Sequence, residues 1–195
     1  MPAINPIELL AVVLGVLYVL LAARGNTWCW LSGIGSALFY IVFAWQKHYY
    51  LDMVVQVYYV LAGGYGWYSW AQAHDKNVSK YFQVNTVSIS SLLFGLAVSM
   101  VLVLPAGYYF SGLGNAYPYL DAATTIFSFY ATWLTIQRVL YSWLIWVFVD
   151  VVMAVQYALV EGYMTTGLYL FFTVMAVYGY WSWKQKLQTD YKTSS

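Results

Sequence analysis

Long apolar stretches alternate with shorter polar ones along the whole chain. Seven apolar stretches are each close to the ~20 residues that a membrane-spanning helix needs. They cover residues 7–23, 28–45, 51–70, 84–104, 120–137, 143–160 and 165–183. Membrane β-strands would alternate in short segments of about ten residues, which these stretches do not. The pattern predicts an all-α integral membrane protein with seven transmembrane helices.

Composition supports this class. Hydrophobic residues make up 63% of the chain and charged residues only 8%, whereas a soluble domain carries nearer ~25% charge. The net charge of +1 gives no reason to expect a nucleic-acid partner, and the single Cys29 excludes an internal disulfide. Segment 7–23 lacks a basic flank before it, so we expect a retained helix rather than a signal peptide.

The distribution of basic residues predicts an orientation. If the N-terminus lies outside, only Lys47 falls on the outer side. The inner side then holds Arg24, Lys76, Lys80, Arg138, Lys184, Lys186 and Lys192. This asymmetry follows the positive-inside rule, so we expect the C-terminus in the cytoplasm.

The chain also contains an internal repeat. One gapless alignment of the chain with itself places residues 65–72 on residues 178–185 and Trp30 on Trp143, and we call it the repeat alignment. The sequence therefore predicts a first three-helix repeat over 1–70, a linker with a connecting helix over 71–119, a second repeat over 120–183 and a cytoplasmic tail over 184–195. A single connecting helix gives parallel repeats, a known transporter plan. Within the linker, Gly, Pro and Ser at 105–119 predict an irregular turn-rich segment.

Asp150 is the most informative single residue, because it lies within an otherwise uncharged apolar run. A carboxylate in hydrocarbon costs about 2.5–3.5 kcal/mol on insertion scales, so membrane proteins keep one chiefly for function. At helical spacing Asp150 shares a face with Trp143, Trp146 and Tyr157. A carboxylate offsets a cation and aromatic faces attract one, so this face suggests a site for a positively charged ligand.

Other polar and aromatic residues within the apolar stretches are further candidates for substrate binding. They are Gln56, Tyr59, Thr132 and Trp30. Each has a structural alternative: Gln56 could join helices, Thr132 could bond its own helix, and Trp30 and Trp143 could belong to an interfacial aromatic belt. No catalytic constellation, phosphate loop or metal-ligand spacing is present in the sequence, so we expect neither an enzyme nor a cofactor.

Several short motifs together resemble the Pnu family of bacterial vitamin transporters, whose best-known members carry nicotinamide riboside. The resemblance runs from Glu8 to Trp183, and the order and spacing of the motifs agree throughout. The motifs are Trp28-Cys29-Trp30, Leu51-Asp52 with Gln56, residues 65–70, Tyr119-Leu120-Asp121-Ala122 with Thr124-Thr125, and Trp143-Leu144-Ile145-Trp146 followed by Asp150.

The resemblance implies a three-plus-one-plus-three bundle in the bacterial inner membrane, assembled as a homotrimer with one substrate path per subunit. It implies facilitated diffusion, with a cytosolic kinase that traps the vitamin. Members of the Pnu family that carry nicotinamide riboside share an Asn-Trp-x-x-Trp-x-x-x-Asn pattern on the sixth helix. This chain has Ser142 and Asp150 at the two Asn positions, which favours the similar thiamine-carrying branch, with nicotinamide riboside as the alternative.

We therefore hypothesise that a cationic heteroaromatic vitamin enters between the two triplets near mid-membrane. The tryptophans would stack on its rings, Asp150 would offset its charge, and Gln56 with Tyr59 would supply hydrogen bonds. Rocking of one triplet would then open the site to the cytoplasm. Two other readings stay open: a sugar carrier built from parallel repeats, and an assembly or receptor subunit that conducts nothing.

Overall fold

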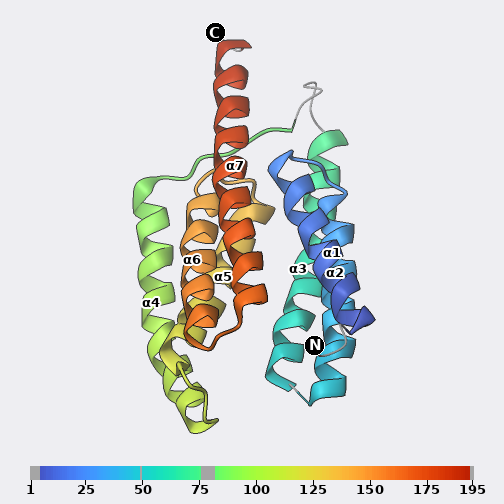
Figure 1. The fold of residues 1–195 in the computed structure, drawn as a ribbon. Coiled ribbons are helices and arrows are strands. Elements are labelled where there is room, and N and C mark those ends of the chain that lie inside the picture. Colours follow the sequence, from blue (N-terminus) through green and yellow to red (C-terminus); the bar gives the residue numbers. More distant parts are fainter. Residues whose placement is uncertain (1–4, 49, 76–81, 194–195) are drawn as a thin grey trace. The chain divides into compact units, whose positions relative to one another are not determined.

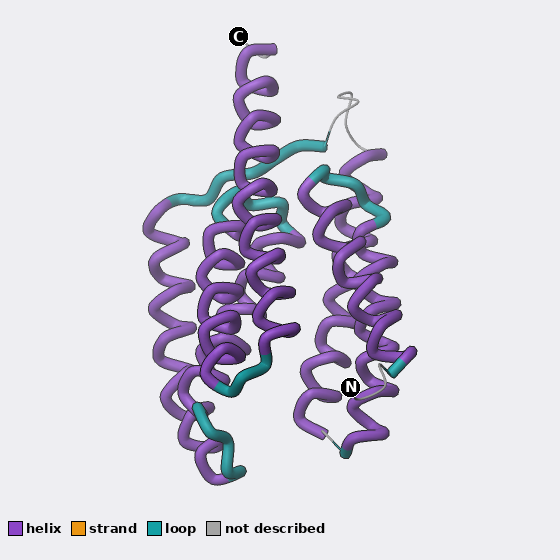
Figure 2. The backbone as a smooth tube through the Cα atoms, viewed as in Figure 1, coloured by secondary structure: helices purple, strands orange, loops and turns teal. Residues whose placement is uncertain are grey.

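The computed structural model describes residues 5–48, 50–75 and 82–193, and these form seven α-helices (Figure 1). Four of them are long and apolar enough to cross a membrane, namely Pro6–Ala23 (α1), Cys29–Lys47 (α2), Ile89–Gly112 (α4) and Ser142–Leu159 (α6). The other three are Tyr50–Asp75 (α3), Pro118–Ile136 (α5) and Tyr163–Thr193 (α7). Helix accounts for most of the described chain, with turns and loops between the helices (Figure 2). Lys76 and Lys80, which contributed to the predicted orientation, lie outside the described residues.

The chain divides into two compact units. The first holds α1, α2 and α3, and the second holds α4, α5, α6 and α7. Within each unit, every helix packs against the next one along the chain. The connecting helix α4 packs on α5 within the second unit, and the predicted division into two repeats and a linker stays a prediction.

Short side chains let the helices of the first unit approach closely. The Ser36 hydroxyl on α2 donates to the Ala11 carbonyl on α1 at 2.8 Å. A Cβ atom on Gly66 of α3 would lie 2.5 Å from the Trp30 ring of α2, so only glycine fits beneath that indole. Asn5 begins this unit by accepting a hydrogen bond from the Ile7 amide, which caps α1.

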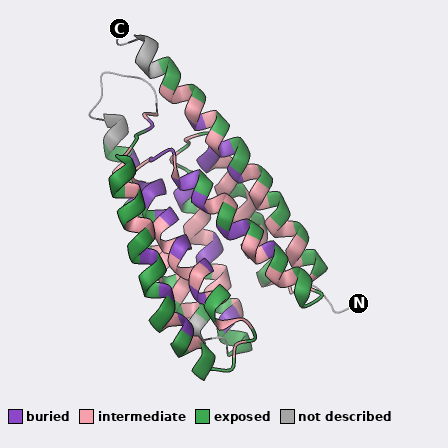
Figure 3. Cartoon of the chain, turned by 90° about the vertical axis from the view of Figure 1, so that its left-hand side faces the viewer, coloured by how far each residue is buried: buried purple, intermediate pink, exposed green. Residues whose placement is uncertain are grey.

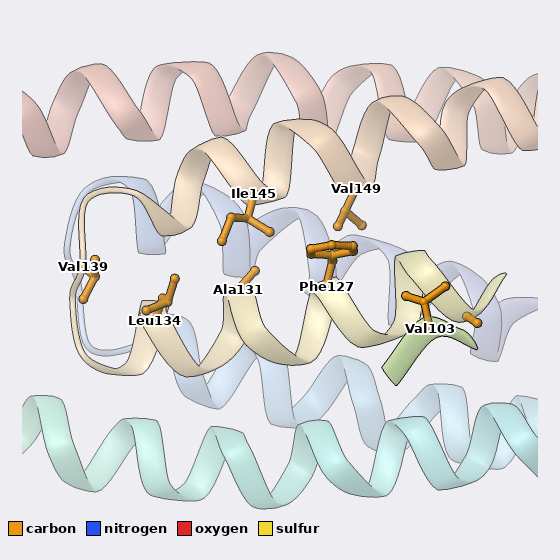
Figure 4. Packing of buried hydrophobic residues seen from close by; sticks show 8 residues of the cluster. Val103, Phe127, Ala131, Leu134, Val139, Ile145 and Val149 are labelled. Atoms are coloured by element: carbon orange, nitrogen blue, oxygen red, sulfur yellow. The ribbon is translucent and has the colours of Figure 1, made fainter. Parts of the chain in front are cut away.

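The core of the second unit lies between α4, α5 and α6. Its buried hydrophobic cluster comprises Val103, Ala122, Phe127, Ala131, Leu134, Val139, Ile145 and Val149. Figure 4 shows Ile145 and Val149 of α6 directed toward Ala131 and Phe127 of α5. Phe127 also meets Phe148 edge-on, with ring centroids 5.4 Å apart. These contacts fix α6 on α5.

Helix α4 is exposed along most of its length (Figure 3). Three features nevertheless fasten α4 and the segment before it to α5 and to the loop that follows α5. A Cβ on Gly95 would overlap the Tyr130 ring, and one on Gly107 would overlap the Tyr119 ring. Ahead of α4, Asn85 bonds the α5–α6 loop through its amide, its carbonyl and its side chain. The bonded atoms are the Arg138 carbonyl (2.8 Å), the Leu140 amide (3.0 Å) and the Gln137 carbonyl (2.7 Å).

The structure reproduces the repeat alignment in the backbone itself. Gly25 follows α1 with φ of 69°, and Arg138 follows α5 at the equivalent position with φ of 59°. His48 and Glu161, which follow α2 and α6, are also equivalent, and both have φ of 59°. Left-handed residues at matching sites show that the two triplets turn their chains in the same way.

Burial lowers the pKa of the Arg138 guanidinium from its ordinary value.

The predicted turn-rich segment over 105–119 was largely wrong. Helix α4 continues through Pro105 to Gly112, and only a short connection precedes α5. Proline removes one helical hydrogen bond, but an apolar environment offers the backbone no water as an alternative, so membrane helices tolerate it. The same helix begins at Ile89, capped by Ser88, rather than at 84.

Candidate functional site

Asp150 lies on α6 and is only 7% exposed. Within the described residues, no group donates a hydrogen bond to its carboxylate and no cation pairs with it. A buried carboxylate normally has such partners, because its desolvation is costly without them. Asp150 is therefore an acid that the protein's own described structure leaves uncompensated.

The stripe of α6 that carries Asp150 faces α7. Two turns before it, Trp143 lies over Gly179 and meets Trp183 edge-on at 5.3 Å. Two turns after it, Tyr157 stacks on Tyr169, with 5.6 Å between centroids and 15° between planes. Residues seven apart lie on nearly the same side of a helix, so Asp150 sits between these two aromatic contacts.

Trp146 faces α5 rather than α7. Its indole Nε1 donates to the Thr135 hydroxyl at 3.2 Å, and that hydroxyl donates to the Ala131 carbonyl at 2.8 Å. Trp146 is half-buried and lies one helical turn before Asp150, so their side chains are neighbours on the α6 surface. Trp146 is therefore next to Asp150 in helical register, while its indole is held against α5.

Thr132 is buried and its hydroxyl donates to the Ser128 carbonyl of its own helix at 2.8 Å. This contact matches the structural alternative for Thr132, and its role in binding stays a prediction.

Three candidates lie in the first unit. Trp30 is 2% exposed and meets Trp70 edge-on at 5.3 Å, so it fills the space between α2 and α3. Tyr59 meets Tyr58 at 5.5 Å. Gln56 is half-buried, and its amide has no hydrogen-bond partner in the described part of the chain. Of the three, Gln56 has the most capacity to bind a polar ligand.

Sequence reasoning missed two polar residues. Thr135 was overlooked although it continues a line of hydroxyls along α5, formed with Thr124, Ser128 and Thr132 at helical spacing. Gln156 was overlooked although it follows Asp150 in the same apolar run. Its amide donates to the Asp121 carboxylate, which also accepts from Asn115 at 2.9 Å. This network ties the end of α6 to the start of α5.

No group of three or more His, Cys, Asp or Glu side chains among the described residues could hold a metal ion. The arrangement instead offers a buried acidic side chain with aromatic neighbours. Such a combination suits recognition of a cation by charge and by ring faces. A helical membrane chain built from two similar triplets, with a polar group kept inside one of them, has the features of repeat-built membrane transporters.

Comparison with known proteins identifies the family. Residues 5–185 match the family model described as nicotinamide mononucleotide transporter. The chain is 26% identical to the nicotinamide riboside transporter PnuC of Escherichia coli (strain K12) over 203 residues, covering 91% of this chain and 84% of that protein. The counterpart from Shigella flexneri matches to the same extent. The crystal structure of a vitamin B3 transporter PnuC matches with a TM-score of 0.76 at 22% identity, over 94% of this chain and 82% of that one.

The chain therefore belongs to the nicotinamide mononucleotide transporter family, the group that includes PnuC. The predicted family resemblance is confirmed. It is a multi-pass membrane protein of a transporter family, not of an enzyme family.

Proposed function

We propose that the protein carries a cationic heteroaromatic vitamin across the membrane, with nicotinamide riboside as the first candidate. The relatives from Escherichia coli and Shigella flexneri are named for this substrate. Its pyridinium ring is planar and positively charged, which suits a carboxylate beside an indole. The observation that supports this proposal most directly is the buried and uncompensated carboxylate of Asp150.

Thiamine is the second candidate, although the sequence alone favoured it. It is also a cation with aromatic rings, and it fits the same chemistry. The reason to retain it is that Ser142 and Asp150 replace both asparagines of the pattern associated with nicotinamide riboside. Because the named relatives carry nicotinamide riboside, that substrate now takes first place.

The proposed site has a role for each candidate residue. Asp150 offsets the positive charge, and Trp146 stacks on the ring. Thr132 and Tyr157 of the same unit contribute polar contacts, and Gln56 and Tyr59 of the first unit stay separate candidates for hydrogen bonds to the vitamin. Trp143 provides indole surface in the second unit and Trp30 does so in the first, and each ring packs over a glycine of its own unit.

The proposed membrane arrangement follows the same family plan. All seven helices cross, as parallel triplets joined by α4, in the bacterial inner membrane, with the N-terminus outside and the C-terminus inside. The skew of lysine and arginine supports this orientation. We further propose a homotrimer that works by facilitated diffusion, coupled to a cytosolic kinase that phosphorylates the vitamin and keeps it in the cell.

Uptake into liposomes that contain only this protein tests the function. Labelled nicotinamide riboside should enter until its concentrations inside and outside the liposomes are equal. Labelled thiamine is tested in parallel. Asp150→Asn should weaken binding by about 1–3 kcal/mol, as expected for a lost interaction with a charged group. Glu161→Gln is the matched control, because it removes one negative charge from an exposed loop of the same unit. If neither vitamin enters, or if Asp150→Asn binds as tightly as the wild type, the proposal is wrong.

A further inference from the structure

The two triplets fill the same space with side chains from opposite helices. In the first triplet, Tyr18 of α1 lies against Gly33 of α2, where a Cβ would come within 3.0 Å of the ring. In the repeat alignment, Ala131 of α5 replaces Tyr18 and Trp146 of α6 replaces Gly33. The large side chain is thus on the first helix in the first triplet and on the second helix in the second triplet. That second helix, α6, also carries Asp150.

A second exchange accompanies the first. Ala22 of α1 is equivalent to Thr135 of α5, and Thr135 accepts the hydrogen bond from the Trp146 indole. The acid shows the same asymmetry, because Ala37 stands in the first triplet at the position of Asp150. The tryptophan, its hydrogen-bond partner and the acid therefore occur together in the second triplet alone.

We infer that Thr135 is a positioning residue that sets the orientation of the Trp146 ring for the ligand. The inference rests on the proposed function. The Thr135 hydroxyl is buried and already bonded to the Ala131 carbonyl and the Trp146 indole, so it acts through Trp146. Its hydroxyl is itself fixed by donation to the Ala131 carbonyl, and the remaining lone pairs can accept from the indole.

This hydrogen bond also defines what Trp146 offers. The indole has a single N–H donor, and Thr135 accepts it. Trp146 therefore presents its ring face to the ligand and no polar group. A ring face recognises a flat, electron-poor cation, which is the class that Asp150 also favours.

The hydrogen bond is tested first without any ligand. Indole N–H signals of the ¹⁵N-labelled protein in detergent are recorded by NMR, and Trp146→Phe assigns the Trp146 signal by its loss. Thr135→Val should shift that signal toward the position of an unbonded indole, and Thr135→Ser should leave it in place. A signal that stays in place in Thr135→Val overturns the inference.

Ligand binding is then measured by calorimetry with nicotinamide riboside and with thiamine. Thr135→Val should raise Kd by about 3- to 10-fold, the range of one neutral hydrogen bond, and Thr135→Ser should restore wild-type binding. Thr124→Val is the matched control, because the Thr124 hydroxyl donates only to backbone carbonyls of α5.

The decisive comparison places Thr135→Val in the Trp146→Phe background. There it should cause no further loss, because no indole remains to be positioned. An equal loss in both backgrounds overturns the inference and leaves the proposed function intact. A wild-type protein that binds neither vitamin overturns both, and the NMR result shows separately whether the hydrogen bond exists.

Discussion

The indole of Trp143 meets that of Trp183 edge-on, with 5.3 Å between ring centroids and 89° between planes. Trp30 and Trp70, their equivalents in the first triplet, meet at 5.3 Å and 85°. In both triplets the first ring of the pair lies over a glycine of the third helix. The repeat is therefore one of packing as well as sequence.

This packing predicts a sharp contrast between two glycines of α7. A Cβ on Gly179 would lie 2.6 Å from the Trp143 ring, whereas Gly167 has open space around it. Gly179→Ala should lower the free energy of unfolding by about 1–3 kcal/mol, as overpacking does. Gly167→Ala should be neutral or slightly stabilising, since alanine favours helix. Thermal unfolding in detergent compares the two, and equal effects would refute the packing role of Gly179.

Asp150 should affect stability and binding in opposite directions. Its carboxylate is buried without a partner among the described residues, so Asp150→Asn removes an uncompensated charge. The ligand-free variant should be more stable by about 1 kcal/mol, while it binds the cationic vitamin less well. Thermal shift with and without ligand measures both effects.

Asp121 provides the control for that experiment. It is also an acid of the second unit, but it accepts hydrogen bonds from Asn115 and Gln156. Asp121→Asn should therefore lower stability. If both variants shift stability in the same direction, Asp150 is not the uncompensated group described above.

The link between Gln156 and Asp121 predicts a pH-dependent variant. Gln156→Glu would set a second carboxylate against that of Asp121, and like charges at this distance repel. The variant should be destabilised at neutral pH and should recover as acid supplies a proton for the two groups to share. Gln156→Ala should instead lose stability by an amount that does not vary with pH. Unfolding midpoints from pH 4 to 8 distinguish the two cases.

Asn85 should control the order of the segment before α4. Asn85→Ala removes the bond from its side chain to the Gln137 carbonyl, which is worth about 1 kcal/mol. Hydrogen exchange of the backbone amides at positions 85 and 140, measured by mass spectrometry, should become faster in the variant. Exchange in α1 and α2 should not change, and a change there would contradict the assignment of this segment to the second unit.

The long apolar stretches predicted all seven helices of the described chain, because a membrane-spanning helix needs about 20 apolar residues. They placed the ends of α4 poorly, since Pro105 and the glycines after it are typical of turns in water and carry less weight in an apolar environment. Helical spacing placed Trp143 and Tyr157 on the α7-facing side of α6 correctly, but Trp146 is turned toward α5 instead. The hydrogen bond from the Trp146 indole to Thr135 was not predictable from the sequence. A threonine that bonds only its own helix and one that also accepts from an indole on the next helix look identical there.

The fastening of α4 to α5 by Gly95 and Gly107 indicates where the chain can be divided without separating packed helices. A gene cut within the loop ahead of Asn85 would yield fragments of three and four helices, each keeping every close contact described between its own helices. Co-expression of the two fragments therefore tests whether each unit folds without a covalent link to the other.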